Sequence, residues 1–550
     1  MKKTHPSMLI GRKRRAHFVA AALLALASLA STRLRATPQF SLVDVWTPAN
    51  SELDGNLANG PEPHFVYAIG VTWDDTILVA CEGRFSHDPA SPDTGEKYLL
   101  VKRSTDHGAS WSSDIVIEGG DGASWTNPAF VTDGITTYLF YGSNYSGTKT
   151  LHYKTSTDNG QTWSARQDIN SLWGASFPNG WVQHGTIGHG IKKLKDPYRG
   201  RLALVFNHRT SATTPAANAK YGVDLLYRDP NGAWARAQGT QPPLTQETDT
   251  DSANDIGPNE SRVAERANGT LALTARKRWN TTTYTRARVS GSAIANGFDW
   301  NGWADASGII GTRMVDGGFI RFSDTSHLYS FSNNPGSTTR LNMAVARSAD
   351  GGVSWGTPQT IYTGPATYSD LARDSLGNIY CVFGRDGNNH NIDLDPANPA
   401  ARVTVARFNL EWVTGTNTPT LVIDNADPGF TTTGTWGSSS TIAGYYGSGY
   451  VHSPSGTNTA TWTPNITVAG NYEVYIRWTA ESNRPDAAPV EVRYNGGTSV
   501  ASATLNQKSE GGSWYYLGTF NLATGTGNSV KLYASDAGSC VADAVMFQKQ

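Results

Sequence analysis

The stretch at positions 104–111 reads STDHGASW, and close copies occur as STDNGQTW at 156–163 and SADGGVSW at 348–355. Each copy follows a strand-like run of residues. The aspartate can accept N–H groups across a turn, the glycine can adopt a positive φ, and the tryptophan can pack between strands. These repeats, called Asp-boxes below, therefore predict hairpin turns and carry no catalytic role of their own.

The spacing of the Asp-boxes predicts a repeated architecture. The first two boxes begin about 50 residues apart, which suits one four-stranded sheet per unit. About six such units fit between residues 40 and 415. Because a ring of small sheets leaves only short, protected edges, we predict an all-β, six-bladed β-propeller over residues 37–415.

Composition changes on both sides of this region. Beyond residues 414–420 the chain is rich in Gly, Ser, Thr and Tyr and contains no Asp-box. This predicts a second domain at 416–550, a jelly-roll-like β-sandwich. Residues 1–36 combine a basic stretch with a short apolar run, which predicts a signal peptide and therefore a secreted or periplasmic protein.

Charge and cysteine content narrow the possible functions. The formal net charge is -1, so nothing indicates a nucleic-acid partner. No later apolar run is long enough to predict a membrane span. The three cysteines, Cys81, Cys381 and Cys540, form no CxxC pair, and we expect neither a metal nor a cofactor. Cys81 and Cys381 lie in strand-like runs and are predicted to be buried, with a disulfide between them as the alternative.

Other motifs accompany the Asp-boxes in a fixed order. They are VACEGR (79–84), DTGEKYLLVKRSTD (93–106), NESRVAERANGTLALTAR (259–276), STTRLNMAVARSADGGVSW (337–355) and GPATYSDLA (364–372). With these motifs, residues 40–413 resemble the exo-α-sialidases (neuraminidases) of glycoside hydrolase family 33. The resemblance implies a propeller fold and a set of site residues.

The resemblance implies that Tyr368 is a nucleophile. A sialic acid carries a carboxylate on its anomeric carbon, which repels an anionic nucleophile but not a neutral phenol. A phenol has a pKa near 10 and needs a base, and the resemblance assigns Glu260 to that role. It assigns Asp93 as the general acid and base, with Asp88 on the same stretch as the fallback.

The family binds the substrate carboxylate with three arginines, since a guanidinium can pair with it bidentately. Arg276 and Arg340 match the second and third. His64 stands where the family has the first arginine, so we expect a changed pocket in which a protonated histidine serves in part. Arg385 is a possible substitute, in a place where the family has a supporting glutamate.

Further residues are expected to line the same pocket. Glu82 and Arg84 match the Glu-x-Arg end of a family strand and are predicted to contact substrate. His184 and His189 lie near the same predicted face without a third ligand at metal spacing, and we interpret them as pocket lining, with ordinary loop histidines as the alternative.

The second domain resembles the golvesin C-terminal or xanthan-lyase-type carbohydrate-binding domain. The resemblance rests on IDNADPGF (423–430), GNYEVYIRW (470–478), WYYLGTFNL (514–522) and VADAVMF (541–547). Several aromatic residues could either stack on sugar rings or form the core: Tyr445, Tyr446, Tyr450 and Trp514.

Together these features predict a retaining exo-glycosidase that removes terminal α-linked sialic acids, with sialylated or other acidic glycans as its partners. One alternative is a hydrolase for a related acidic sugar, such as another nonulosonic or uronic acid. Another is a non-catalytic glycan-binding propeller.

Overall fold

The computed structural model describes most of the chain. The described residues are 38–47, 64–84, 95–143, 150–172, 182–184, 187–209, 221–237, 258–277, 285–291, 304–310, 315–335, 339–387, 401–454 and 456–550. The predicted signal peptide at 1–36 lies outside them. Within these ranges no helix is long and apolar enough to cross a membrane.

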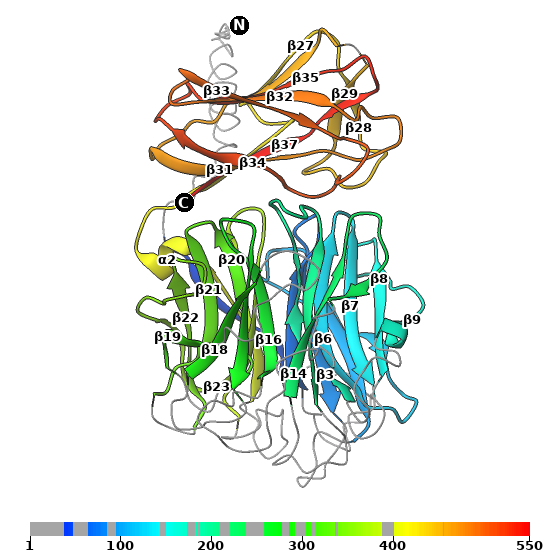
Figure 1. Ribbon diagram of the computed structural model, residues 1–550, viewed down its shortest axis with the longest axis vertical. Helices are drawn as coiled ribbons and strands as arrows, with labels where there is room; N and C mark the ends of the chain where they lie inside the picture. Colours follow the sequence, from blue (N-terminus) through cyan, green and yellow to red (C-terminus); the bar gives the residue numbers. More distant parts are fainter. Residues whose placement is uncertain are drawn as a thin grey trace, which may run out of the picture.

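The first part of the chain consists of sheets placed side by side, in which the strand pairs are antiparallel except for the parallel pair of β11 and β6 (Figure 1). One sheet contains β2 (His64–Val71), β3 (Ile77–Arg84), β4 (Lys97–Ser104) and β5 (Ile115–Glu118). The next contains β6 (Trp125–Asp133), β7 (Thr136–Ser143), β8 (Thr150–Ser156) and β9 (Gln167–Asp168), with β11 (Gly188–His189) beside β6, and η2 (Asn170–Leu172) follows it. A third contains β10 (Val182–His184), β12 (Ile191–Lys192), β13 (Leu202–Arg209), β14 (Tyr221–Arg228) and β15 (Ala235–Arg236). A fourth contains β16 (Pro258–Glu265), β17 (Leu271–Lys277), β18 (Thr285–Gly291) and β19 (Ala304–Ile310).

The last sheet of this part has seven strands because one long strand belongs to two units. Its strands are β20 (Phe319–Ser323), β21 (Ser326–Ser332), β22 (Leu341–Ser348), β23 (Gln359–Arg373), β24 (Asn378–Arg385), β25 (Arg402–Asn409) and β1 (Phe40–Trp46). The first half of β23 pairs with β22 and its second half pairs with β24. Strand β1 completes the sheet by pairing with β25, which joins the start of this region to its end.

The Asp-boxes form the hairpin turns that the sequence predicts. In the first box Asp106 accepts the N–H groups of Ala109 and Ser110 at 3.0 and 2.9 Å. The box glycine Gly108 has φ of 81°. Trp111 packs against the apolar cluster under the turn. The other two boxes repeat this arrangement around Asp158 and Asp350.

The second part of the chain is a separate all-β unit above the first (Figure 1). The helix α2 (Leu410–Thr414) precedes it. One sheet contains β26 (Thr420–Asp424), β37 (Ala544–Lys549), β31 (Gly470–Arg477) and β34 (Tyr515–Leu522). A second contains β27 (Phe430–Thr433), β30 (Thr459–Trp462), β35 (Ser529–Tyr533), β32 (Ala488–Tyr494) and β33 (Ser499–Leu505). A short third sheet contains β28 (Gly437–Ser439), β29 (Tyr450–Ser453) and β36 (Cys540–Ala542).

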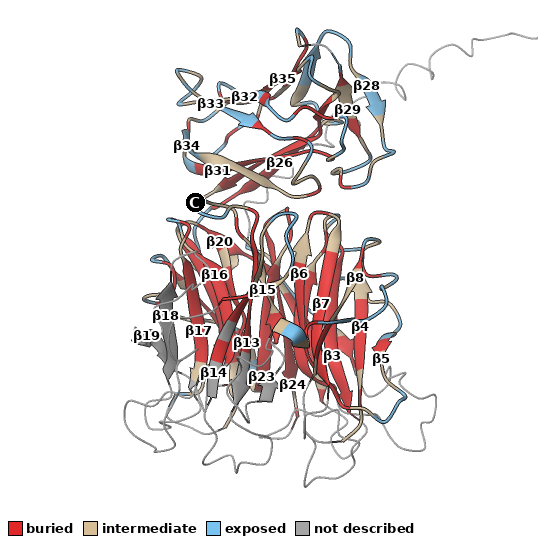
Figure 2. Cartoon of the chain, turned by 45° about the vertical axis from the view of Figure 1, so that its right-hand side comes forward, coloured by how far each residue is buried: buried red, intermediate tan, exposed pale blue. Residues whose placement is uncertain are grey.

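Both parts have apolar cores built from alternating strand residues (Figure 2). Cys81, Cys381 and Cys540 are buried free thiols, so the predicted burial is confirmed and the alternative disulfide is wrong. Burial raises the pKa of each thiol, which suits small core residues rather than reactive groups.

The two parts meet through polar contacts. Arg321 bonds Glu473 at 2.7 Å, and Arg477 donates to the carbonyl of Trp73 at 2.6 Å. In the first part, this contact comes from the turns and strand ends after β2, β6, β20 and β23. Strands β2 and β3 are antiparallel neighbours, so His64 and Arg84 lie at the opposite end from the second part. We call this opposite end the site end.

Candidate active site

Several strands bulge near the site end. Strand β23 shifts register between Thr367 and Ser369, so that Tyr368 has no partner on β24. Tyr368 has φ of 23°, a conformation that a bulky residue adopts only under strain. Similar shifts place Val66 of β2 and Asn127 of β6 at φ of 54° and 56°. Such bulges re-aim side chains, and here one turns a tyrosine out of the regular pleat.

Tyr368 meets Glu260 of β16. The phenol donates to Glu260 Oε1 at 2.5 Å. Glu260 also sits at a register shift, between Pro258 and Ser261. Arg276, at the end of β17, donates from Nη1 to both Glu260 oxygens at 3.1 and 2.9 Å and to the Tyr368 oxygen at 3.4 Å. Three predicted site residues from three strands therefore share one hydrogen-bonded cluster.

The protonation of Tyr368 follows from its surroundings. Burial raises the pKa of the phenol far above its ordinary value, and the charge of Glu260 raises it further. The guanidinium groups of Arg276 and Arg340 oppose this effect on the pKa without cancelling it. The phenol is thus protonated at neutral pH, and Glu260 lies where it can accept the proton.

Arg340 also lies close to the tyrosine. Its guanidinium carbon is 5.6 Å from the centre of the Tyr368 ring, and Nη1 donates to Thr367 at 3.2 Å. Arg276 and Arg340 therefore both bring positive charge close to Tyr368, which suits an anionic group beside it.

Glu82 and Arg84 are buried at the end of β3, where they bond to each other at 2.8 Å. Lys97 approaches Glu82 at 3.4 Å, and the N–H of Asn127 donates to the same carboxylate at 2.9 Å. The Arg84 guanidinium lies 4.6 Å from the centre of the Phe65 ring, and the Phe65 ring meets the Tyr368 ring at 4.7 Å. The pair thus supports the wall behind the tyrosine, and direct substrate contact by either residue stays a prediction.

His64 is fully buried, and its ring stacks on Trp46 with centroids 5.2 Å apart. This gives the ring a packing role, while its role towards a substrate carboxylate stays a prediction. Arg385 is already paired with two carboxylates, and its role as a substitute for the first arginine of the family stays a prediction. Its guanidinium binds Asp44 at 2.8 Å and Asp386 at 2.6 Å, because β1 and β24 bring two carboxylates to it.

Two predicted residues fall outside the described part of the chain: Asp93 and its fallback Asp88. For His184 the structure describes only the backbone, as the last residue of β10. The assignment of Asp93 as the general acid therefore stays a prediction from the sequence.

Beneath the tyrosine lies an ionic network that the sequence did not reveal. Arg262 is fully buried between Asp316 and Asp370, to which it is hydrogen bonded. His189 Nδ1 lies 2.8 Å from Asp370 Oδ1, so this histidine is a partner of Asp370. Burial alone raises the pKa of Asp370, but His189 and Arg262 outweigh it and hold that pKa below its usual range. Asp370 and Arg262 both stand in motifs quoted above, yet their pairing across strands leaves no local signal.

His189 also lines a cavity of about 270 Å³, together with Gly70, Leu371 and Arg373. Within the described ranges no group of three His, Cys, Asp or Glu side chains is arranged to hold a metal ion.

The Asp-box sheets, the buried Tyr368–Glu260–Arg276 cluster and the appended sandwich define a class: a two-part all-β protein whose repeat sheets carry a polar site at one end. Comparison with known families agrees with this class. The chain belongs to the BNR repeat-like domain family, which matches residues 76–381. The golvesin C-terminal domain matches residues 421–549, so both predicted resemblances are confirmed at the level of the family.

The similar proteins include sialidases and a xanthan lyase. A sialidase of Micromonospora viridifaciens is 26% identical over 460 residues, covering 76% of this chain and 63% of the relative. A xanthan lyase of Bacillus sp. (strain GL1) is 42% identical over 137 residues, covering 24% of this chain and 14% of the lyase. Among solved structures, the Hadza microbial sialidase Hz136 is 18% identical with a TM-score of 0.48, covering 64% of this chain and 66% of that one.

Proposed function

We propose that this protein is a secreted, retaining exo-glycosidase that hydrolyses terminal α-linked sialic acids on a six-bladed propeller. The observation that carries the proposal is the 2.5 Å hydrogen bond from the Tyr368 phenol to Glu260, flanked by Arg276. The similarity to a sialidase over 76% of the chain supports the same reaction class.

In the first half-reaction the Tyr368 oxygen attacks the anomeric carbon while Glu260 takes the phenolic proton. The glycosidic bond breaks, and Asp93 gives a proton to the departing oxygen. The product is a covalent glycosyl-tyrosine. A tyrosine in this role departs from the usual pair of carboxylates in retaining glycosidases.

In the second half-reaction a water molecule attacks the same carbon. Asp93, now a carboxylate, takes one proton from this water, and the bond to Tyr368 breaks. Glu260 returns its proton to the departing phenolate. Two displacements at one carbon restore the starting configuration, so the released sugar retains its anomeric stereochemistry.

The neighbouring charges suit an acidic sugar. Arg276 and Arg340 both lie close to Tyr368, where they can bind a substrate carboxylate on the anomeric carbon. A second candidate is a hydrolase for a related acidic sugar. It is favoured by His64, which stands where the family has its first arginine and is packed against Trp46.

A panel of fluorogenic glycosides tests the proposal. We expect turnover of an α-sialoside, with the retained anomer as the first product by NMR. Turnover of an α-linked 3-deoxynonulosonic acid or a uronide, without turnover of the sialoside, would select the second candidate. Absence of turnover across all acidic glycosides would refute both candidates.

A further inference from the structure

Asp370 lies two residues after Tyr368 in β23, and its carboxylate contacts three other strands. Oδ2 accepts the N–H of Ile69 in β2 at 3.0 Å. Oδ1 lies 2.8 Å from Nδ1 of His189 in β11 and accepts from Nε of Arg262 in β16 at 3.3 Å. Because the carboxylate is fully buried, water does not compete for these bonds. The side chain of Asp370 therefore joins β23 to β2, β11 and β16 close to the tyrosine.

Arg262 connects the strand that carries the glutamate of the cluster to the strand that carries its tyrosine. Nη1 donates to the carbonyl of Ser261, the residue directly after the glutamate, at 3.0 Å. Nη2 donates to the carboxylate of Asp316. The carbonyl of Asp316 in turn accepts the N–H of Ser369, the residue directly after the tyrosine, at 3.3 Å. Arg262 is thus linked to the backbone next to both partners of the short hydrogen bond.

These contacts fall where both strands leave their regular pairing. Strand β16 shifts register next to Ser261, and β23 shifts register next to Ser369. A residue inside such a bulge has no partner on the neighbouring strand, so its direction depends on other contacts. Arg262 and Asp316 are buried and supply such contacts at both bulges.

Two glycines allow the backbone to approach this network closely. Gly188 has φ of 89°, and a Cβ at this position would overlap the guanidinium of Arg262. A Cβ at Gly318 would overlap the backbone nitrogen of Leu371, the residue after Asp370. The guanidinium and the strand of the carboxylate are therefore enclosed by backbone, which restricts both to one arrangement.

We propose that Arg262 and Asp370 are positioning residues that hold the phenol of Tyr368 and the carboxylate of Glu260 at hydrogen-bond distance. Both positioning side chains are 0% exposed, whereas Arg276 is 17% exposed, so they act through the two bulges and not on a substrate. A misplacement of about 1 Å at a reacting centre costs about 100-fold in rate. The kinetic consequence rests on the glycosidase proposed above, but the positioning itself does not.

The kinetic test compares Arg262→Lys with wild type on the acidic glycoside that wild type turns over best. A lysine keeps the charge but lacks the planar fork that reaches three partners at once. We expect kcat to fall about 10–100-fold, because the phenol and its base are misplaced. KM should change less than about 3-fold, because the two arginines close to the tyrosine are unaltered. A KM that rises as much as kcat falls would overturn the proposal.

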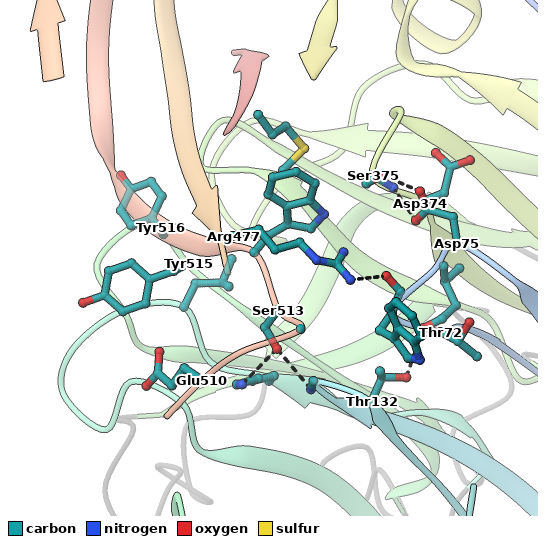
Figure 3. Close-up of a pocket in the computed structure, with 18 of the residues that line it drawn as sticks. Thr72, Asp75, Thr132, Asp374, Ser375, Arg477, Glu510, Ser513, Tyr515 and Tyr516 are labelled. Atoms are coloured by element: carbon teal, nitrogen blue, oxygen red, sulfur yellow. Dashed lines mark hydrogen bonds between the residues drawn. The ribbon is translucent and has the colours of Figure 1, made fainter. Parts of the chain in front are cut away.

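Arg477→Lys is the matched control, because Arg477 is another buried arginine. It donates to the carbonyl of Trp73 at 2.6 Å across the contact between the two parts of the chain (Figure 3). We expect this variant to lower Tm and to keep wild-type kcat, since its contacts lie at the opposite end from the Tyr368 cluster. An equal fall of kcat in both lysine variants would overturn the proposal, because general destabilisation would then explain both.

Asp370→Asn is a second variant, and it keeps the test decisive if Arg262→Lys fails to fold. The asparagine has nearly the same shape, but only one of its two terminal atoms is an acceptor. Because Ile69 and Arg262 donate to different oxygens of Asp370, the amide NH₂ group would face one of these donors in either orientation. We expect the same fall of kcat with little change of KM.

A measurement without substrate separates this inference from the glycosidase. The tyrosines are labelled with ¹³C at Cζ, the NMR signal of Tyr368 is identified by its loss in Tyr368→Phe, and Glu260→Gln calibrates its response to a changed acceptor. We expect the signal to shift in Arg262→Lys and Asp370→Asn but not in Arg477→Lys. If it shifts while wild type turns over no acidic glycoside, the glycosidase alone is refuted. An unshifted Tyr368 signal in the folded variants would overturn the positioning role, whatever the turnover.

Discussion

The phenol of Tyr368 donates to Glu260 Oε1 at 2.5 Å, although the two residues lie 108 positions apart. Both stand at bulges, one in β23 and one in β16, so the regular pleat of neither strand would bring them together. The chain holds Tyr368 at φ of 23° to make this contact, which implies that the contact has a use beyond stability.

Removal of the phenolic oxygen is the most direct test of that use. We expect Tyr368→Phe to lower kcat by about 10²–10⁴-fold or more while the fold is kept, because the ring still packs on Phe65. Glycoside turnover and circular dichroism measure the two effects. Phe65→Leu is a control that alters the packing but keeps the nucleophile. Wild-type turnover in Tyr368→Phe would remove the tyrosine from the mechanism.

The Arg276 contacts predict a distinct kinetic effect. Arg276 Nη1 contacts both Glu260 and Tyr368, and a lysine cannot reproduce the planar fork. We expect Arg276→Lys to lower kcat for an acidic glycoside, and with it kcat/KM, by about 10–100-fold. Arg340→Lys is the matched comparison. Because Arg340 bonds Thr367 rather than Glu260, we expect Arg340→Lys to raise KM more than it lowers kcat. Equal kcat in wild type and Arg276→Lys would contradict this division of roles.

Local patterns predicted much of this molecule. Each Asp-box turn follows from residues close in sequence, such as Asp106 and Gly108, and the structure agrees. Family motifs named Tyr368 and Glu260, which the strands bring together. The Asp370–Arg262 pairing could not be predicted, because it depends on which strands meet at depth rather than on spacing along the chain.

The surroundings of the aromatic residues in the second part could not be predicted from the sequence either. Tyr450 belongs to the core, whereas Tyr446 and Trp514 pack together, with Trp514 lining the cavity between the domains. Tyr450 is therefore a core residue, whereas stacking of Tyr446 or Trp514 on sugar rings stays a prediction. The sequence shows that such aromatics are amphipathic, but not that a second domain covers them.

His64 is the site residue on which sequence and packing give different expectations. If it replaces an arginine that binds carboxylate, His64→Arg should tighten sialoside binding by about 1–3 kcal/mol. However, His64 is fully buried against Trp46, so the larger arginine side chain would overpack this position. We therefore expect His64→Arg to lose about 1–3 kcal/mol of unfolding free energy in urea. His64→Phe, which retains stacking, is the control. A stable His64→Arg with a lower sialoside KM would show that the pocket has room for the missing guanidinium.

The Asp-boxes predict a pH-dependent contribution to stability. Burial alone raises the pKa of Asp106, but hydrogen bonds from Ser110 and its neighbours outweigh this and lower it to about 2. A carboxyl with a depressed pKa stabilises the fold fully above its unfolded value of 3.8, and this stabilisation is lost as pH falls towards 2.

We therefore expect Asp106→Asn to lower Tm by about 2–4 °C at pH 7, since it removes hydrogen bonds of about 1 kcal/mol. Its Tm should also fall less steeply than that of wild type between pH 4 and 2. Asp486→Asn, at a surface carboxylate 64% exposed, is the comparison. Identical acid profiles for Asp106→Asn and wild type would contradict this account of the box.

The last prediction concerns the contact between the two parts. Arg321 binds Glu473 at 2.7 Å, but it also binds Asp324 on its own side at 2.7 Å, and water can replace much of the rest. The Tyr368 cluster lies at the other end of the strands. We therefore expect residues 37–415 alone to fold with a lower Tm, and to turn over small glycosides at near wild-type kcat/KM. Glu473→Gln in the full chain, which removes one charge across the contact, should lower Tm less than the truncation. An insoluble or inactive 37–415 fragment would show that the sandwich is required for the propeller to fold, and the domains would then have to be regarded as one folding unit.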